Sequence, residues 1–324
     1  EEIVFSRFFD GDFICLHQTY YQYTGFGYWK TLSESQLKKK IFNILKKLYT
    51  LNKNGEEVWQ YGTDNANRRC HNYVSIGIVL PSETEKELEN QSSLLCFNNG
   101  TLNTETGRFR EHRKEDYLTL NLPVNYDPNS TLDENSAFLT FLKTSFGGDQ
   151  IPLIRAVTQM LINPACPYGK FPHIKGASGS GKGALLETWA SLFPEEVTQE
   201  IANFSLLSNP DKVHQNLKNK KFIYNADASA YMAEPNTFYN LVQNDRVAGR
   251  ALHSSETYSK KWNVRLAIAS TNHLKIENAG AGWQRRCIPI TTKGAVKEEE
   301  KDRYLGERIK QEKGKIIAWA LSMP

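Results

Sequence analysis

Apolar residues recur at helical spacing in several segments of the chain, and each such segment predicts an amphipathic helix. The clearest is "SESQLKKKIFNILKKLY", residues 33–49, where lysines occupy the face opposite the apolar one. The apolar positions on one face are Leu37, Ile41, Ile44, Leu45 and Leu48. Ser33 followed by Gln36 predicts a capping box at the start of this helix.

Further helical patterns cover residues 134–146, 151–162, 184–193 and 234–245. Short apolar runs that predict strands alternate with the later ones: "KFPHIKG" (170–176), "KFIYNAD" (221–227) and "VRLAIASTN" (264–272). This alternation predicts an α/β core with a mainly parallel sheet. Since proline cannot donate to a sheet, we expect Pro172 at the opening residue of its strand.

Turn signals divide the chain. "CFNNGTLNTETGRF" (96–109) predicts a strand, an Asn-Gly turn, a second strand and a glycine-containing turn. The polar stretch "NYDPNSTLDENS" (125–136) suits a domain boundary. We therefore expect a mixed α+β N-terminal module over 1–130, a helical collar or linker over 131–170, and the α/β core over 171–324.

The composition indicates which broad classes of protein the chain can belong to, but it does not identify a function. Hydrophobic residues make up 40% of the 324 residues and the net charge is +4, which permits a nucleic-acid partner without requiring one. The five cysteines form no C-x-x-C pair, and "RRCH" offers only two adjacent zinc ligands, so we expect thiols in a reducing cytoplasm. No apolar run or signal peptide predicts a membrane partner. Because the chain begins at Glu1 and stops after "AWALSMP", we expect a piece of a longer polypeptide.

The stretch "GASGSGKGAL" carries the strongest chemical signal. Gly176, Gly181 and Lys182 fit G-x-x-x-x-G-K between a predicted strand and a predicted helix, the pattern of a phosphate-binding loop. The next residue, which normally supplies a hydroxyl to Mg²⁺, is Gly183. Since Mg²⁺ usually retains several waters, we expect ATP and Mg²⁺ binding to survive, and hydrolysis to be slower or more dependent on other ligands. The predicted ATP-binding residues are Gly176, Ala177, Ser178, Gly179, Ser180, Gly181, Lys182, Gly183 and Ala184.

Three polar positions downstream complete a candidate catalytic set. Asp227 ends an apolar strand and could hold Mg²⁺, directly or through water. Asn272 ends the next strand and could orient a water or sense the γ-phosphate. In "AGAGWQRRCIPI", Arg285 or Arg286 could serve as an arginine finger from a neighbouring subunit, and we favour Arg285. Their order after Lys182 indicates an ATP hydrolase.

In this order, the motifs resemble those of superfamily 3 DNA helicases, specifically the C-terminal helicase region of phage and plasmid primase-helicases, which are related to poxvirus primase-helicases. "CFNNGTLNTETGRF" leading to "YDP", "LVQNDRVAGRAL", "IASTNH" and "GKIIAWALSMP" also resemble segments of that family. The resemblance implies an AAA+-like P-loop core, a homo-oligomeric ring, usually a hexamer, around single-stranded DNA, and an upstream primase-polymerase domain. It also implies a role in replication in a bacterial host cytoplasm. A hairpin over 246–262 would contact DNA through Arg246, Arg250, His253, Tyr258, Lys260 and Lys261.

The sequence departs from the family pattern at the loop and at the acidic strand end. Gly183 replaces Ser or Thr, and only Asp227 is evident where two acidic residues are usual. Two alternatives therefore stay open: a phosphotransferase of the nucleotide-kinase type, and a non-hydrolysing module that binds ATP and DNA.

Overall fold

The computed structural model describes residues 2–9, 11–16, 19–59, 61, 63–79, 93–228, 234–250, 257–272, 274, 276–277, 280–297, 299 and 301–323. The chain forms two compact units. The first comprises Glu1–Cys96, Gly100–Asn103 and Arg108–Asn121, and the second Phe97–Asn99, Thr104–Gly107 and Leu122–Pro324. The predicted collar and core both fall in the second unit, and the division between those two stays a prediction.

The first unit combines short sheets with helices. Its helices are α1 (Glu2–Phe8), α2 (Glu34–Leu45), α3 (Asp64–Gly77) and the 3-10 turn η1 (Lys114–Asp116). Strands β1 (Phe13–Leu16), β2 (Thr19–Tyr23) and β3 (Trp29–Leu32) form an antiparallel sheet, and β4 (Thr50–Leu51) pairs with β5 (Glu57–Val58). A further sheet has the order β8-β7-β6-β9, and all its residues except Phe97 and Leu122 fall in this unit. Its strands are β6 (Leu94–Phe97), β7 (Gly100–Asn103), β8 (Phe109–Arg110) and β9 (Asn121–Leu122).

Helix α2 confirms the amphipathic pattern and its capping signal. The Ser33 hydroxyl accepts from the Gln36 N–H, and the Gln36 side chain accepts from the Ser33 N–H. Each bond satisfies a donor that the first turn of a helix leaves without an intrahelical partner. The buried positions of α2 are Leu37, Ile41 and Leu45, which pack with Cys70 and Val74 of α3.

The second unit is built on a five-stranded sheet with the order β11-β12-β15-β10-β16, in which every neighbouring pair is parallel. The strands are β10 (Phe171–Lys175), β11 (Thr198–Glu200), β12 (Phe222–Asn225), β15 (Arg265–Ser270) and β16 (Cys287–Thr291). All six residues of β15 are buried, as expected of a central parallel strand. The predicted α/β fold with a parallel sheet is thereby confirmed.

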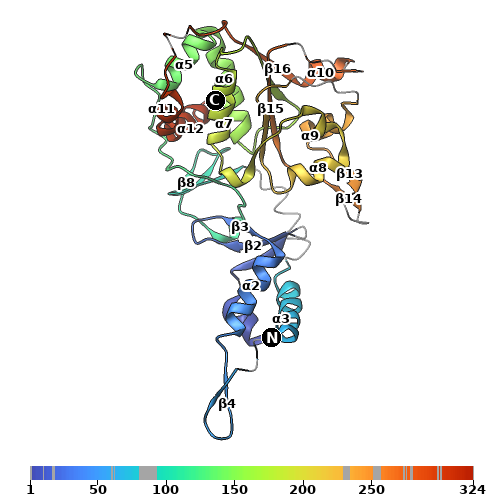
Figure 1. Ribbon diagram of the computed structural model, residues 1–324. Coiled ribbons are helices and arrows are strands. Elements are labelled where there is room, and N and C mark those ends of the chain that lie inside the picture. Colours follow the sequence, from blue (N-terminus) through green and yellow to red (C-terminus); the bar gives the residue numbers. More distant parts are fainter. Residues whose placement is uncertain are drawn as a thin grey trace. The chain divides into compact units, whose positions relative to one another are not determined.

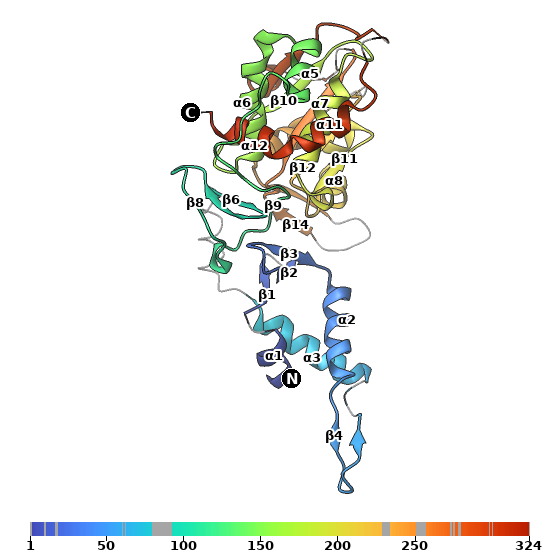
Figure 2. The ribbon, with the colours of Figure 1, turned by 90° about the vertical axis from the view of Figure 1, so that its left-hand side faces the viewer.

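Helices cover both faces of this sheet (Figure 1). On one side lie α5 (Ala137–Ser145), α6 (Ile151–Ile162), α7 (Lys182–Ser191), α11 (Leu305–Gln311) and α12 (Lys313–Leu321). The other side carries α8 (Pro210–Leu217), α9 (Asn236–Gln243) and α10 (Gly280–Arg286). The hairpin of β13 (Val247–Arg250) and β14 (Thr257–Lys260) follows α9, and short 3-10 turns are η2 (Gly148–Gln150), η3 (Glu195–Val197) and η4 (Phe204–Ser208). Figure 2 shows α11 beside α5 and α7, which it contacts.

Pro172 lies one residue deeper in its strand than the sequence predicts, at the second position of β10. It pairs with Ile288 of β16, whereas pairing with β15 begins at His173. The missing N–H of Pro172 is tolerated because this residue precedes the ladder with β15.

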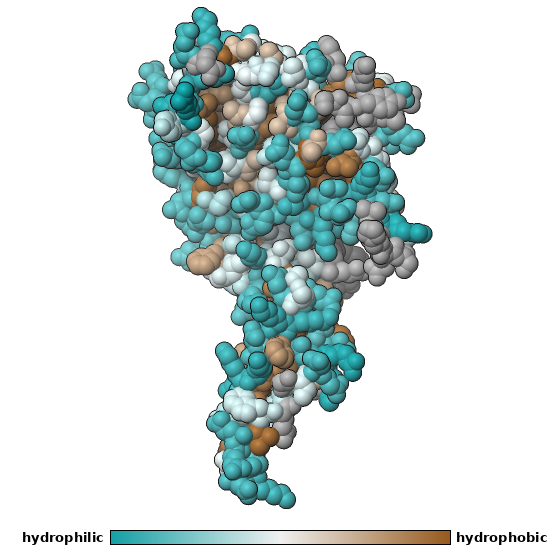
Figure 3. All heavy atoms as spheres, viewed as in Figure 1, coloured by the Kyte–Doolittle hydropathy of each residue, from teal (hydrophilic) through white to brown (hydrophobic). Residues whose placement is uncertain are grey.

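The described surface gives no sign of a membrane span. Hydrophilic residues cover most of the face seen in Figure 3. Among the described residues, every helix is too short or too polar to cross a bilayer.

Candidate nucleotide-binding site

A cavity of about 720 Å³ opens in the second unit, in the size range of small-molecule sites. The loop after β10 and the residues after β12 and β15 reach it, and binding sites of parallel sheets form at such carboxyl ends. The loop side is lined by Ser178, Gly179, Ser180, Gly181, Lys182, Gly183 and Ala184, with Ala226, Asp227 and Thr271 from the sheet edge. The opposite wall is lined by Asn135, Ala137, Thr140, Phe141, Thr144, Ser145, Val296, Lys301, Asp302, Leu305 and Arg308.

The glycines of the loop are required by its geometry. Gly179 and Gly181 adopt φ values of 70° and 92°, in the left-handed region where side chains are strained. A Cβ on Gly176 would stand 1.8 Å from Thr292 Oγ1. The loop backbone therefore turns tightly against the residue after β16, as a phosphate-binding loop must if its N–H groups are to converge.

Lys182 begins α7 and folds back over this loop. Its Nζ donates to the carbonyl oxygens of Gly176 (2.8 Å) and Ala177 (2.7 Å). Burial lowers the pKa of Lys182, and the nearby Asp227 carboxylate acts in the opposite direction. The ammonium is thus held at the start of a ten-residue helix, where backbone N–H groups and the helix dipole also favour an anion.

Gly183 occupies an open position at the first turn of α7. A Cβ built on it meets no atom within 4 Å. The absence of the usual hydroxyl is therefore not a consequence of crowding, since the fold leaves space for a Ser or Thr at this position.

Asp227 and Asn272 differ in their relation to the cavity. The exposed Asp227 follows β12 and lines the cavity, and the N–H of the adjacent Ala228 donates to Ala269 of β15 at 2.7 Å. Asn272 is exposed just beyond Thr271, which is the residue of this strand end that lines the cavity. The cavity therefore brings Asp227 together with Lys182 but does not include Asn272.

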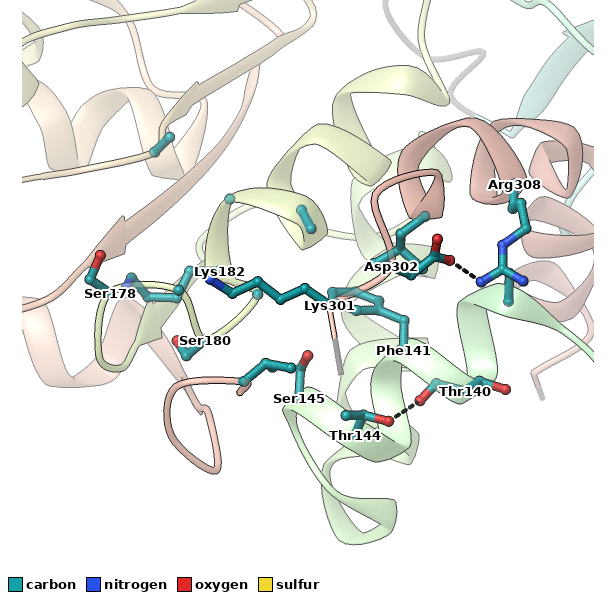
Figure 4. A pocket seen from close by; sticks show the side chains of 18 of the residues that line it. Thr140, Phe141, Thr144, Ser145, Ser178, Ser180, Lys182, Lys301, Asp302 and Arg308 are labelled. Carbon is teal, nitrogen blue, oxygen red and sulfur yellow. Dashed lines mark hydrogen bonds and ion pairs between the residues drawn. The ribbon is translucent and has the colours of Figure 1, made fainter. Parts of the chain in front are cut away.

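The opposite wall comes from parts of the chain that the sequence did not connect with the site. In Figure 4, the Lys301 side chain extends towards the loop that carries Ser178 and Ser180. The Asp302 carboxylate instead forms an ion pair with Arg308. No local pattern marks these residues, because only the folding of α11 against α5 and α7 brings them to the cavity.

Glu312 links two elements of this wall, the C-terminal helices and α5. Its carboxylate accepts from Ser136 Oγ (2.7 Å), Ala137 N (2.8 Å) and Phe138 N (3.1 Å) at the N-terminus of α5. A negative charge is favourable at that end of a helix. The junction between α11 and α12 thereby fixes the first turn of a helix that lines the cavity.

The two candidate finger residues have different surroundings. The Arg286 guanidinium is buried, lies 4.5 Å from the centre of the Tyr239 ring, and donates to Gly282 O and Gln243 Oε1. Arg285 is exposed. Within the subunit, Arg286 joins α10 to α9, whereas Arg285 is presented to the solvent.

The predicted hairpin is present as an antiparallel pair, β13 and β14. Arg246, Arg250 and Lys261 are exposed on it. Tyr258 donates to Pro210 O of α8, and Lys260 Nζ lies 4.1 Å from the centre of the Trp262 ring. Those two side chains anchor the hairpin, and their predicted contact with DNA stays a prediction.

His253, also predicted to contact DNA, lies outside the described residues.

Comparisons with known proteins agree with this architecture. Residues 5–147 match the family described as D5 N terminal like. The apo structure of the NrS-1 C terminal region is similar, with a TM-score of 0.54 and 14% identity over 96% of this chain and 65% of that chain. An A form apo structure of the same region gives a TM-score of 0.53 and 13% identity, with the same coverage.

The chain thus spans 65% of the length of the NrS-1 structures that it matches. At this level of identity, the likeness shows the fold. It agrees with the resemblance to primase-helicases that the sequence motifs indicate. Residues 5–147, which make up less than half of the chain, thus match the D5 N terminal like family, and the chain has the fold of the NrS-1 C terminal region.

Proposed function

We propose that the protein is an ATP-dependent DNA helicase or translocase that binds single-stranded DNA as a homo-oligomeric ring. The observation that carries the proposal is the tight glycine loop, with Lys182 at its end and Asp227 close by, beside a cavity large enough for a nucleotide. The family and the fold point in the same direction.

In the proposed mechanism, loop N–H groups and the start of α7 hold the phosphates of ATP. Lys182 exchanges its hydrogen bonds to two carbonyl oxygens for hydrogen bonds to phosphate oxygens. The positive ammonium then pairs with the negative phosphates. Asn272, which is exposed next to the cavity-lining Thr271, would position the attacking water from the strand end. These groups act by orientation and electrostatic stabilisation, the main sources of catalysis in phosphoryl transfer.

The donor set also fits Mg²⁺. Asp302 is engaged by Arg308, whereas the exposed Asp227 carboxylate faces the cavity near Lys182. Asp227 would hold Mg²⁺ through water, together with phosphate oxygens and further waters in place of a hydroxyl at position 183. When bound, the ion would neutralise charge that develops on the transferred phosphoryl group.

In the proposed ring, an arginine of the neighbouring subunit supplies a further positive charge to the phosphates. Arg285 is the better candidate finger because its side chain is exposed, while Arg286 already contacts Tyr239 and Gln243 of its own subunit. Changes at the interface during hydrolysis would move the hairpin, where Arg246, Arg250 and Lys261 would track DNA phosphates.

The test is ATP turnover by the wild type and by Lys182→Ala, each with and without single-stranded oligonucleotide. We expect DNA to stimulate the wild type, and the variant to lose turnover while its thermal unfolding midpoint stays unchanged. Undiminished turnover by Lys182→Ala would show that the site is wrongly assigned.

A second candidate function, a non-hydrolysing ATP- and DNA-binding module, is favoured by one observation. The loop lacks the metal-binding hydroxyl at Gly183, although the space for it is open. Tight ATP binding without turnover, with oligonucleotide present, would support this alternative over the helicase.

A further inference from the structure

Two cations line the cavity besides Lys182, and one of them, Arg308, is paired with Asp302. The other, Lys301, lines the cavity from the segment that precedes α11. A Cβ built on Gly179, in the middle of the glycine loop, would stand 3.9 Å from Lys301 Nζ. Lys182 and Lys301 therefore approach the same loop from opposite walls of the cavity.

The segment that follows β16 is hydrogen-bonded to β10, to α5 and to the glycine loop. The N–H of Val296 donates to Gly179 O at 3.2 Å, the N–H of Lys293 donates to Ser145 O at 2.8 Å, and the N–H of Thr292 donates to Lys175 O at 3.1 Å. Val296 therefore contacts the same residue of the loop, Gly179, that lies near Lys301 Nζ.

The carboxylate of the neighbouring Asp302 does not repel an anion bound next to Lys301, because it is paired with another side chain. Asp302 forms its ion pair with Arg308, and Figure 4 shows this pair on the α11 side of the cavity while Lys301 extends to the loop. Adjacent residues thereby place their opposite charges in different parts of the cavity.

We infer that Lys301 is a second phosphate-binding residue of the nucleotide site, contributed by the same subunit as the glycine loop. The inference rests on the proposed nucleotide binding and adds a cation that would reach the bound phosphates from the wall opposite the loop. An ammonium at this distance from the loop can donate to phosphate oxygens that the loop N–H groups hold.

The experiment measures ATP and inorganic tripolyphosphate binding to the full chain by calorimetry. Lys301→Met keeps the length of the side chain and removes its charge, and Lys301→Arg keeps the charge. Lys297→Met is the matched control, because Lys297 is an exposed lysine of the same segment that does not line the cavity. Lys182→Ala reports on the loop itself.

We expect Lys301→Met to weaken both ligands by about tenfold, as loss of one charge-assisted hydrogen bond requires. The dependence of affinity on salt should also become shallower. Lys301→Arg should stay within about threefold of the wild type, and Lys297→Met within about twofold, since neither removes a charge from the cavity.

Two results would overturn the inference while the proposed function stands: equal affinities for Lys301→Met and Lys297→Met, or weakening for ATP without weakening for tripolyphosphate. If the wild type itself bound neither ligand, the proposed function would fail instead.

Discussion

Two glycines of the G-x-x-x-x-G-K-G segment, one at the start of the loop and one in the first turn of α7, differ in the side chains that their positions permit. Gly176 is in contact with Thr292, so that no side chain fits, whereas Gly183 faces open space. The sequence marks both only as glycines in a motif. Their distinct roles follow from the strand β16, which brings Thr292 against the loop from more than a hundred residues away.

Gly176→Ala and Gly183→Ala form a matched pair that tests this difference. We expect Gly176→Ala to lower the free energy of unfolding by about 1–3 kcal/mol, because the new Cβ must displace Thr292 or the loop. Gly183→Ala should not lower it, because the position is open and alanine favours a helix more than glycine does. Chemical denaturation of both variants measures the difference, and equal losses would contradict the loop geometry.

Gly183→Thr tests whether the missing hydroxyl limits catalysis. The open position accommodates the side chain, and its oxygen would stand where a metal ligand is usual. We expect ATP turnover to be preserved or raised, measured at saturating Mg²⁺ and compared with Gly183→Val, which has a similar shape without the hydroxyl. A collapse of nucleotide affinity in the Thr variant alone would count against this account of the metal site.

At the scale of elements, local signals predict helices better than they predict which surfaces meet. The capping box of α2 and its apolar face are readable directly from residues 33–49. Helix α8 also carries a readable start, since Asn209 caps it and Pro210 opens it. By contrast, the contact of Glu312 with the first turn of α5 joins residues about 175 positions apart, and no spacing rule finds it.

Glu312→Gln tests that junction. The amide keeps one acceptor but removes the charge that faces the N–H groups of Ala137 and Phe138. We expect the free energy of unfolding to fall by about 1–2 kcal/mol, measured by denaturation. Glu307→Gln is the control, an exposed residue of α11 paired with Lys310, and it should leave the free energy of unfolding close to that of the wild type. Equal effects would mean that Glu312 does not fix α5.

The hairpin makes a separate prediction about DNA. Arg250 and Lys261 are exposed and predicted to contact phosphates, so Arg250→Ala and Lys261→Ala should each weaken binding to any oligonucleotide sequence. Each should also reduce the slope of log affinity against log salt by roughly one. Fluorescence anisotropy measures both quantities, with Lys143→Ala of α5 as the control. An unchanged slope in both hairpin variants would place the DNA elsewhere.

For the molecule as a whole, the order of the motifs is enough to predict the α/β fold and the glycine loop. The glycine loop, Asp227 and Asn272 each follow a strand, and these strands belong to one parallel sheet. The sequence alone does not give the second wall of the cavity. Lys301 and the Asp302–Arg308 pair become part of it only when the C-terminal helices pack beside α5 and α7. Likewise, the sequence does not distinguish the adjacent Arg285 and Arg286. In the structure, Arg286 is buried against Tyr239 of α9, whereas Arg285 is exposed.

In the proposed ring, the loop of one subunit holds ATP and Arg285 of a neighbouring subunit assists its hydrolysis. The most direct measurement is the ATP turnover of Lys182→Ala and Arg285→Ala, each alone and then co-expressed as mixed assemblies. We predict that each variant alone is inactive and that the mixture recovers turnover, because some interfaces then combine an intact loop with an intact arginine. Full activity of Arg285→Ala alone, or a mixed assembly as inactive as its parts, would contradict the claim.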